Sequence, residues 1–210
     1  MTILPWIPAN STIRKESDVH PHDKIEKANL YHAFDIGSTE IEILNWLHAQ
    51  VLLFKPNLIL ETGGYEGAGT VALAHACKMN GFGKVISIEI NPKQCVKIES
   101  MLEENNLRDY AEVECYDSIN YLNMTNHVFD MGFFDSETEI RAKECEICFD
   151  RNILRNLAVF HDTSPHRLPQ ITPTHIQHKY RSDVFELARK YNFSVTDFNY
   201  SRGFMAIWIG

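Results

Sequence analysis

The sequence lacks any long apolar run and any excess of basic residues. No segment reaches the roughly 18 apolar residues of a membrane-spanning helix, and the N-terminal stretch has neither a basic leader nor a sustained apolar core. Lysine and arginine total 20 against 28 acidic residues, a formal charge of -8, which disfavours broad contact with a phosphate backbone. We therefore expect a cytoplasmic protein with neither a membrane nor a nucleic acid as partner.

Cysteine is also scarce. An odd number of five cysteines, scattered through the expected helices and strands, fits reduced thiols better than a disulfide framework. Cys145 and Cys148 form a CxxC pair. Without a second pair, this spacing only weakly indicates zinc or redox chemistry, and packing within a helix is the favoured interpretation.

The length and the order of the elements predict one α/β domain. A chain of 210 residues suffices for one well-buried core. Residues 1–38 carry prolines and polar residues without a clean period, so we expect an N-terminal arm or lid there and a single domain over 39–210. The expected helices are 39–54, 68–80, 92–105, a short one after 118, 137–154 and 181–191; the expected strands are 58–61, 84–90, 111–116, 128–135 and 157–162, followed by a terminal hairpin. This alternation predicts a Rossmann-like parallel sheet with helices on both faces.

The segment Glu61–Thr70 is a glycine-rich loop between the first of these strands and its helix. Glycine permits positive φ and a close approach of a ligand to the backbone. The following helix directs free N–H groups and a partial positive charge toward the loop. Such a loop suits a ligand that carries a carboxylate or a phosphate.

The glycine spacing identifies a family resemblance. Dinucleotide-binding folds use G-x-G-x-x-G, whereas this loop reads acid-x-G-x-x-x-G-x-G, which resembles the first motif of class I S-adenosylmethionine-dependent methyltransferases. The resemblance covers about residues 40–210. It implies a seven-stranded sheet of order 3-2-1-4-5-7-6 with strand 7 antiparallel, and S-adenosylmethionine as cofactor.

In this family an acid at the end of the second strand accepts both ribose hydroxyls, a position that Glu89 occupies in the strand expected over 84–90. Asp117 and Ser118 stand where the family contacts the adenine. The resemblance therefore implies a set of cofactor-binding residues: Glu61, Gly63, Gly64, Tyr65, Gly67, Gly69, Thr70, Glu89, Ile90, Asp117, Ser118 and Asp135.

The strands expected over 128–135 and 157–162, which are the fourth and fifth of the sheet, end in Asp135 and Asp162. They look similar to the acids that hold a divalent metal in the catechol O-methyltransferase-like and antibiotic-sugar O-methyltransferase branches, which implies Mg²⁺ at these two positions. The chain departs from that pattern at Thr163 and Thr138, where the branch has a third ligand and a lysine base. In the alternative interpretation, Asp135 lines the cofactor pocket and Asp162 caps a loop.

His161 is a second candidate for catalysis. An imidazole with an ordinary pKa of about 6.5 can accept a proton at neutral pH. Adjacent strand residues point to opposite faces, so we expect either His161 or Asp162 to face the pocket. The spacing of the other histidines matches no common zinc site. We interpret them as residues of exposed lids, one with His166, His175 and His178 and one in the N-terminal arm with His20, His22 and Asp23.

The segment after the strand expected over 128–135 bears on the class of acceptor. Amino-methylating enzymes that act on nucleic acids commonly carry prolines there, and Asp135-Ser136-Glu137-Thr138 has none. With the acidic balance, this favours transfer of a methyl group to a hydroxyl of a small polar metabolite or sugar. Metal-independent N-methylation and a non-catalytic S-adenosylmethionine-binding module remain as alternatives, a nicotinamide oxidoreductase is the least favoured, and a homodimer is left open.

Overall fold

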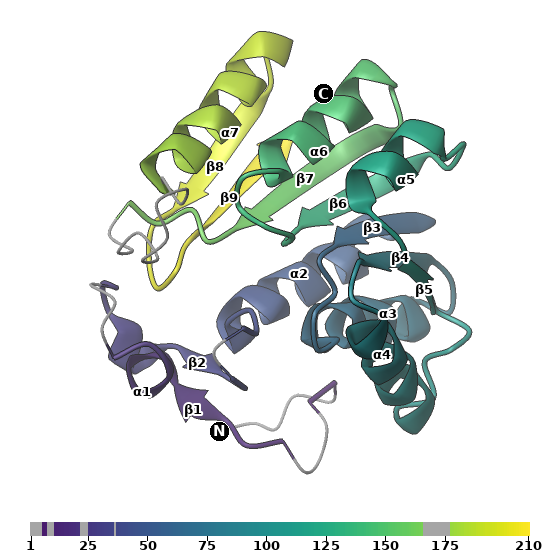
Figure 1. Cartoon of the computed structure of the whole chain (residues 1–210), viewed down its shortest axis with the longest axis vertical. Coiled ribbons are helices and arrows are strands. Elements are labelled where there is room, and N and C mark those ends of the chain that lie inside the picture. Colours follow the sequence, from purple (N-terminus) through teal and green to yellow (C-terminus); the bar gives the residue numbers. More distant parts are fainter. Residues whose placement is uncertain (1–5, 8–10, 22–24, 36, 166–176) are drawn as a thin grey trace.

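A seven-stranded sheet forms the centre of the molecule in the computed structural model, which describes residues 6–7, 11–21, 25–35, 37–165 and 177–210 (Figure 1). The strands of this sheet are β3 (Leu58–Thr62), β4 (Lys84–Glu89), β5 (Ala111–Cys115), β6 (Phe129–Phe134), β7 (Leu154–His161), β8 (Ser194–Phe198) and β9 (Phe204–Trp208).

The strand order is β5-β4-β3-β6-β7-β9-β8. All neighbouring pairs are parallel except those of β9, which runs antiparallel to both β7 and β8. Numbered from the first strand after the arm, this is the order 3-2-1-4-5-7-6 with strand 7 antiparallel. The predicted topology is confirmed.

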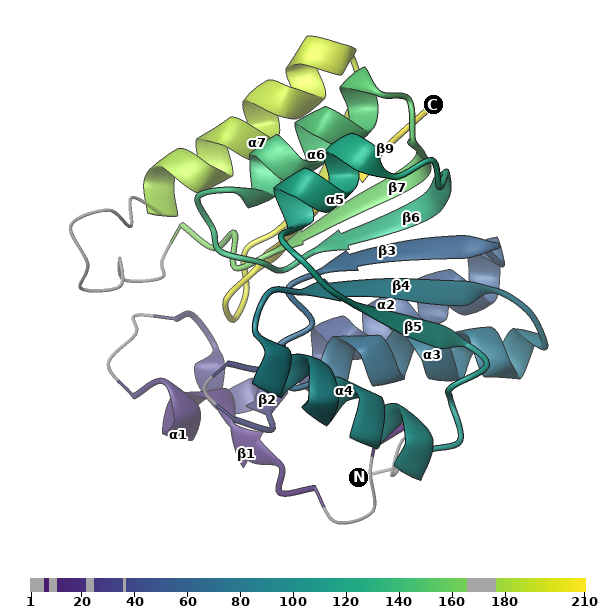
Figure 2. The same ribbon diagram turned by 45° about the vertical axis from the view of Figure 1, so that its right-hand side comes forward.

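Helices cover both faces of the sheet, as predicted (Figure 2). One face packs against α2 (Ile41–Phe54), α3 (Ala68–Asn80) and α4 (Pro92–Glu104), and the other against α5 (Ser118–Met124), α6 (Arg141–Asp150) and α7 (Gln177–Tyr191). The apolar core is accordingly split into two clusters, one on each face. The central strand β6 is buried on both faces, which explains why it is apolar apart from Asp130 near its start.

Some element boundaries differ from the predictions. The helix expected over 137–154 is limited to Arg141–Asp150, and β7 begins at Leu154 instead of 157. Asn152 adopts a left-handed φ of 55°, and the N–H of Ile153 donates to the carbonyl of Cys148. This is a helix-ending turn, so the chain can start β7 earlier than the apolar pattern indicates.

The N-terminal arm contains short regular elements. They are β1 (Arg14–Lys15), α1 (Glu16–Val19), the 3-10 helix η1 (Ala28–Leu30) and β2 (His32–Ala33), and β1 pairs antiparallel with β2. The arm lies beside α2 at the end of the sheet where the strands finish (Figures 1 and 2). Within the part of the chain that the structure describes, no helix combines the length and apolar character needed to cross a membrane.

Candidate functional site

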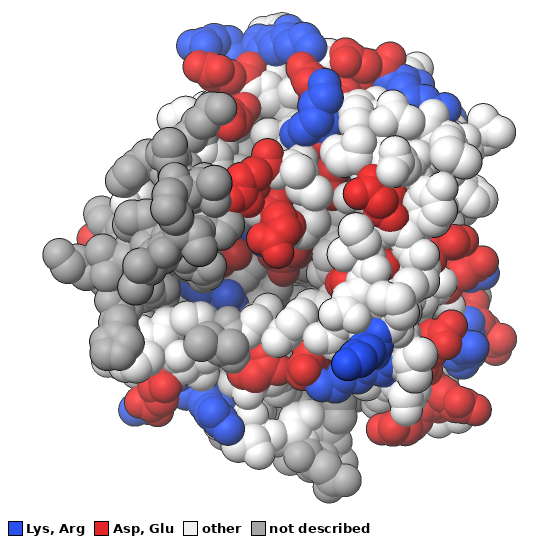
Figure 3. All heavy atoms as spheres, in the orientation of Figure 1, with Lys and Arg blue, Asp and Glu red and all other residues white. Residues whose placement is uncertain are grey.

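A cavity of about 530 Å³ lies at the carboxyl ends of the central strands. The cavity is lined by an acid at or just beyond the end of each of four strands: Glu89 at the end of β4, Asp117 after β5, Asp135 after β6 and Asp162 after β7. Arg202 from the β8–β9 turn also lines it. From β3 the chain adds β4 and β5 on one side of the sheet, and then β6 and β7 on the other side. Open α/β sheets bind ligands at the carboxyl ends of the strands where the strand order switches sides in this way. Figure 3 shows acidic side chains gathered around a hollow in this face.

The glycine loop is shaped by its own packing. Gly63 has a φ of +77°, and a Cβ there would lie 2.5 Å from the backbone oxygen of Asp135. Gly67 has a φ of +88° at the N-cap of α3. A Cβ on the helical Gly69 would collide with the Glu61 carboxylate. Gly63 and Gly69 are therefore required by contacts within the protein itself.

Replacing Gly63 with alanine should destabilise the fold much more than replacing Gly81. Both residues have a φ of +77°, a value that strains any residue with a Cβ, but a Cβ at Gly81 meets nothing within 4 Å. We expect Gly81→Ala to lower the free energy of unfolding by about 1 kcal/mol and Gly63→Ala by about 3 kcal/mol or more, as measured by urea denaturation. Equal losses would show that the contact with Asp135 is unimportant.

Glu61 in β3 and Thr70 in α3, at the two ends of the loop segment, do not line the large cavity. Glu61 is buried and accepts hydrogen bonds from Thr70 Oγ1 at 2.5 Å and Ser87 Oγ at 2.6 Å. Burial raises the pKa of Glu61 to about 7, although both hydroxyls oppose the shift. Glu61 reaches only a small cavity of about 20 Å³ that Gly63, Gly64 and Gly69 also line.

Glu89 connects the glycine loop to the start of α4. Its Oε2 accepts the N–H of Tyr65 at 2.9 Å, and its Oε1 accepts the N–H of Asn91 at 2.8 Å. Tyr65 follows Gly64 with a positive φ of 45°, and its ring packs on Gly37 of the arm. Ile90 is 67% exposed beside the carboxylate. The carboxylate is thus fixed in the cavity wall before any ligand binds.

The adenine-side candidates are both held by hydrogen bonds. Asp117 caps α5 by accepting the N–H of Asn120 at 2.8 Å. The Ser118 hydroxyl donates to Glu144, a buried residue of α6 that also accepts the Thr62 hydroxyl at 2.8 Å. The side chain of Ser118 is therefore engaged with α6, and a contact with adenine would need its backbone.

Asp135, His161 and Asp162 lie together, with potential ligand atoms within 4.8 Å of one another. Nδ1 of His161 is 3.0 Å from Asp135 Oδ1, and Nε2 is 2.5 Å from Glu40 Oε2. His161 is 1% exposed. Both ring nitrogens are engaged by carboxylates. His161 does not line the large cavity, whereas Asp162 does, so Asp162 is the better placed of the two to take a proton from a ligand there.

Of the two adjacent residues His161 and Asp162, it is Asp162 that lines the large cavity. Asp162 has a left-handed φ of 62°, so its side chain turns to the same side as that of His161, and the two groups are 3.7 Å apart. The alternation of a regular strand ends at His161, where β7 finishes.

Sequence reasoning missed the two buried arginines that surround this cluster. Arg141 of α6 lies between Asp135 and Asp162, with nitrogen–oxygen distances of 3.1 and 3.3 Å. Arg202 is 3.2 Å from Glu40 and 3.6 Å from Asp162. Both arginines are at most 5% exposed. The carboxylates of the cluster are thus already paired with cations of the protein.

Stability should decrease above neutral pH because of His161. Burial alone lowers the pKa of this imidazole, but Asp162, Asp135 and Glu40 outweigh burial and raise the pKa to about 9, against about 6.5 in the unfolded chain. A raised pKa contributes stability that is fully present below about pH 6.5 and is lost as the pH rises through about 9. We expect the free energy of unfolding to fall by about 3 kcal/mol over this range.

Urea denaturation at pH 6 to 10 measures this loss. His161→Gln cannot titrate in this range and should show a much flatter profile. An equally steep profile in the variant would assign the pH dependence to other groups.

The remaining candidates lie elsewhere. Cys145 and Cys148 are buried in α6 among core residues, and burial raises the pKa of both thiols, so packing within a helix is the interpretation that fits. His20 pairs with Glu16 at 2.6 Å. Several predicted lid residues lie outside the described part of the chain: His22, Asp23, His166, His175 and the side chain of His178.

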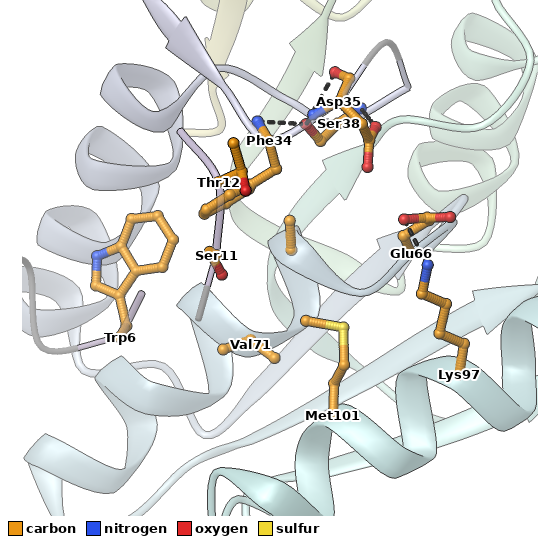
Figure 4. A pocket seen from close by; sticks show the side chains of 11 residues that line it. Trp6, Ser11, Thr12, Phe34, Asp35, Ser38, Glu66, Val71, Lys97 and Met101 are labelled. Carbon is orange, nitrogen blue, oxygen red and sulfur yellow. Dashed lines mark hydrogen bonds and ion pairs between the residues drawn. The ribbon is translucent and has the colours of Figure 1, made fainter. Parts of the chain in front are cut away.

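A second cavity, of about 250 Å³, lies between the arm, α3 and α4. Figure 4 shows Trp6 of the arm on one side, Val71 and Met101 along the floor, and the ion pair of Glu66 with Lys97 on the other side. Among the residues that the structure describes, this cavity shares no lining residue with the large one. Its described charged lining residues are Asp35, Glu66 and Lys97.

No protein-family model and no curated protein sequence matches the chain. Solved structures match it over most of its length. One is the SAH-bound methyltransferase PaMTH1 of Podospora anserina, at 14% identity, covering 96% of this chain and 91% of that chain with a TM-score of 0.68. A second is an O-methyltransferase of Bacillus cereus in complex with SAH, at 20% identity, covering 82% and 83% with a TM-score of 0.68.

A third is the O-methyltransferase TomG of Streptomyces achromogenes, involved in tomaymycin synthesis and solved in complex with SAM, at 19% identity, covering 83% and 82% with a TM-score of 0.67. The chain has the class I methyltransferase fold. The candidate cavity lies at the edge of the sheet where the resemblance implies the cofactor, with Glu89 at the end of the second strand of the sheet and Asp135 after the fourth.

Proposed function

We propose that this chain transfers the methyl group of S-adenosylmethionine to an oxygen atom of a small polar acceptor. The carboxylate of Glu89 carries the proposal, because it is fixed at the end of β4 by two backbone N–H groups in the wall of the large cavity. A carboxylate in this position can accept hydrogen bonds from two neighbouring ribose hydroxyls. The glycine loop beside it supports the same ligand.

The proposed cofactor site divides the predicted residues into two groups. The wall of the large cavity includes Gly63, Tyr65, Glu89, Ile90, Asp117, Ser118 and Asp135. Glu61, Gly64 and Gly69 line only the small cavity, while Gly67 and Thr70 line neither; these five hold the shape of the loop. When bound, S-adenosylmethionine supplies a methyl group activated by a positively charged sulfur.

The acceptor should lie at the other end of the cavity, near Asp135, Asp162 and Arg202. Carboxylate oxygens accept hydrogen bonds and do not donate them, so this end suits an acceptor with an O–H group. The Asp162 carboxylate would accept the proton of the acceptor hydroxyl as that oxygen takes the methyl group from the cofactor's sulfur. Two of the similar structures are named O-methyltransferases, which supports oxygen over nitrogen.

A transfer assay with methyl-labelled S-adenosylmethionine tests the proposal. The acceptor panel pairs hydroxylated metabolites and sugars with amines of similar size. We expect label in an O-methyl product, and a rate about 10²- to 10⁴-fold lower in Asp162→Asn. Asp109→Asn, at an exposed position outside the cavity, is the matched control.

Label found only on nitrogen would replace this proposal with N-methylation. Binding of S-adenosylmethionine without transfer to any compound of the panel would instead favour a non-catalytic binding module.

A further inference from the structure

A guanidinium group lies between the two acids that the sequence resemblance assigns to a metal. Nη2 of Arg141 is 3.1 Å from Oδ1 of Asp135, and Nη1 is 3.3 Å from Oδ2 of Asp162. We propose that methyl transfer by this chain uses no divalent cation, because Arg141 fills the position between Asp135 and Asp162 that such an ion would need. This inference rests on the proposed methyl transfer.

Arg141 is fixed in this position from several sides. Its Nε donates to the carbonyl of Ser136 at 2.6 Å, and Nη1 donates to the carbonyl of His161 at 2.8 Å. The Tyr180 hydroxyl donates to the same His161 carbonyl at 3.0 Å, and the Tyr180 ring lies 5.6 Å from the guanidinium carbon. Moving Arg141 aside would break its hydrogen bonds to the carbonyls of Ser136 and His161, in a site where the arginine is only 5% exposed.

The donor set also fits a divalent cation poorly. Mg²⁺ prefers six oxygen ligands at about 2.0–2.1 Å. Here Asp162 has a guanidinium on either side, with Arg202 3.6 Å from Oδ1 and Arg141 3.3 Å from Oδ2. Two fixed positive groups at these distances repel a dication, and this argues against the Mg²⁺ that the resemblance implies at Asp135 and Asp162, although these acids and His161 lie close enough to hold an ion.

A guanidinium in the place of a metal ion widens the range of acceptors that the site can bind. A divalent ion is useful where two neighbouring oxygens of the acceptor bind it together. With Arg141 holding the carboxylates, the acceptor needs only one O–H that reaches Asp162. We therefore infer that this site accepts compounds with a single isolated hydroxyl as well as those with adjacent hydroxyls. Arg141 acts as a positioning residue that keeps Asp135 and Asp162 in place.

Titration of Mn²⁺ into the purified protein, followed by electron paramagnetic resonance, tests the proposal without an acceptor. We expect the wild type and Asp162→Asn to bind Mn²⁺ equally weakly. Arg141→Ala removes the guanidinium and should bind Mn²⁺ at least about tenfold more tightly than the wild type, and added guanidinium chloride should compete with that binding. Arg155→Ala, an exposed arginine of β7, should behave as the wild type.

Saturable Mn²⁺ binding in the wild type that is lost in Asp162→Asn would overturn the proposal. The wild-type comparison decides the matter alone if Arg141→Ala does not fold. Binding of S-adenosylmethionine, measured in the same samples with a chelator present, reports separately on the proposed function. A protein that binds the cofactor and also Mn²⁺ at Asp162 would keep the function and lose this inference.

Discussion

Replacing Glu40 with alanine is expected to lower the free energy of unfolding by about 3–5 kcal/mol. Glu40 is fully buried at the start of α2 and accepts the backbone N–H of Arg202 at 2.7 Å. Its carboxylate also contacts the Arg202 guanidinium at 3.2 Å and His161 at 2.5 Å. Although burial opposes ionisation, Arg202 and His161 lower the pKa of Glu40 strongly. The variant would leave two buried cations without this partner.

Glu42→Ala is the matched control for Glu40→Ala, measured by urea denaturation at pH 6. Glu42 lies two residues further along the same helix and pairs with His32 at 2.8 Å, but its side chain is 35% exposed. Exposed pairs contribute little, and we expect a loss of about 1 kcal/mol. Similar losses in the two variants would mean that the buried cluster does not stabilise the fold as the contacts indicate.

The second large effect is expected at Glu89, where alanine should weaken S-adenosylmethionine binding by about 10²- to 10⁴-fold. Two hydrogen bonds from ribose hydroxyls to a carboxylate contribute about 1.5–3 kcal/mol each. The variant also frees the N–H groups of Tyr65 and Asn91 that the carboxylate accepts. Glu89→Gln retains one oxygen acceptor and should lose less affinity than Glu89→Ala.

The sheet and its loop could be predicted because their signals are local. Each of the strands β3 to β7 is followed by a turn and a helical pattern, and the glycine spacing within Glu61–Thr70 selects one family of folds. The structure confirms the order of all seven strands. The contacts that exclude a side chain at Gly63 and Gly69 could not be predicted. The residue that a Cβ at Gly63 would meet, Asp135, is 72 residues away in the sequence, and the glycine spacing does not show what a Cβ would meet at either position.

The cluster of buried charges could not be predicted for a similar reason. Glu40 and His161 are 121 residues apart, and Glu40 and Arg202 are 162 residues apart. A single sequence offers no pattern that joins them. The sequence indicated the acids after β6 and β7 but not Arg141, which α6 directs back between them. The metal hypothesis was therefore based on the acids alone.

Calorimetric titration of S-adenosylmethionine tests the central claim most directly. The wild type is compared with Glu89→Ala and with Glu112→Ala, an acid of β5 whose Lys84 contact is largely exposed, and NAD is titrated as a second ligand. We expect micromolar binding of S-adenosylmethionine to the wild type and to Glu112→Ala, loss of binding in Glu89→Ala, and no binding of NAD. If the wild type does not bind S-adenosylmethionine, or if Glu89→Ala binds it as tightly as the wild type, the assignment of this cavity to the cofactor is contradicted.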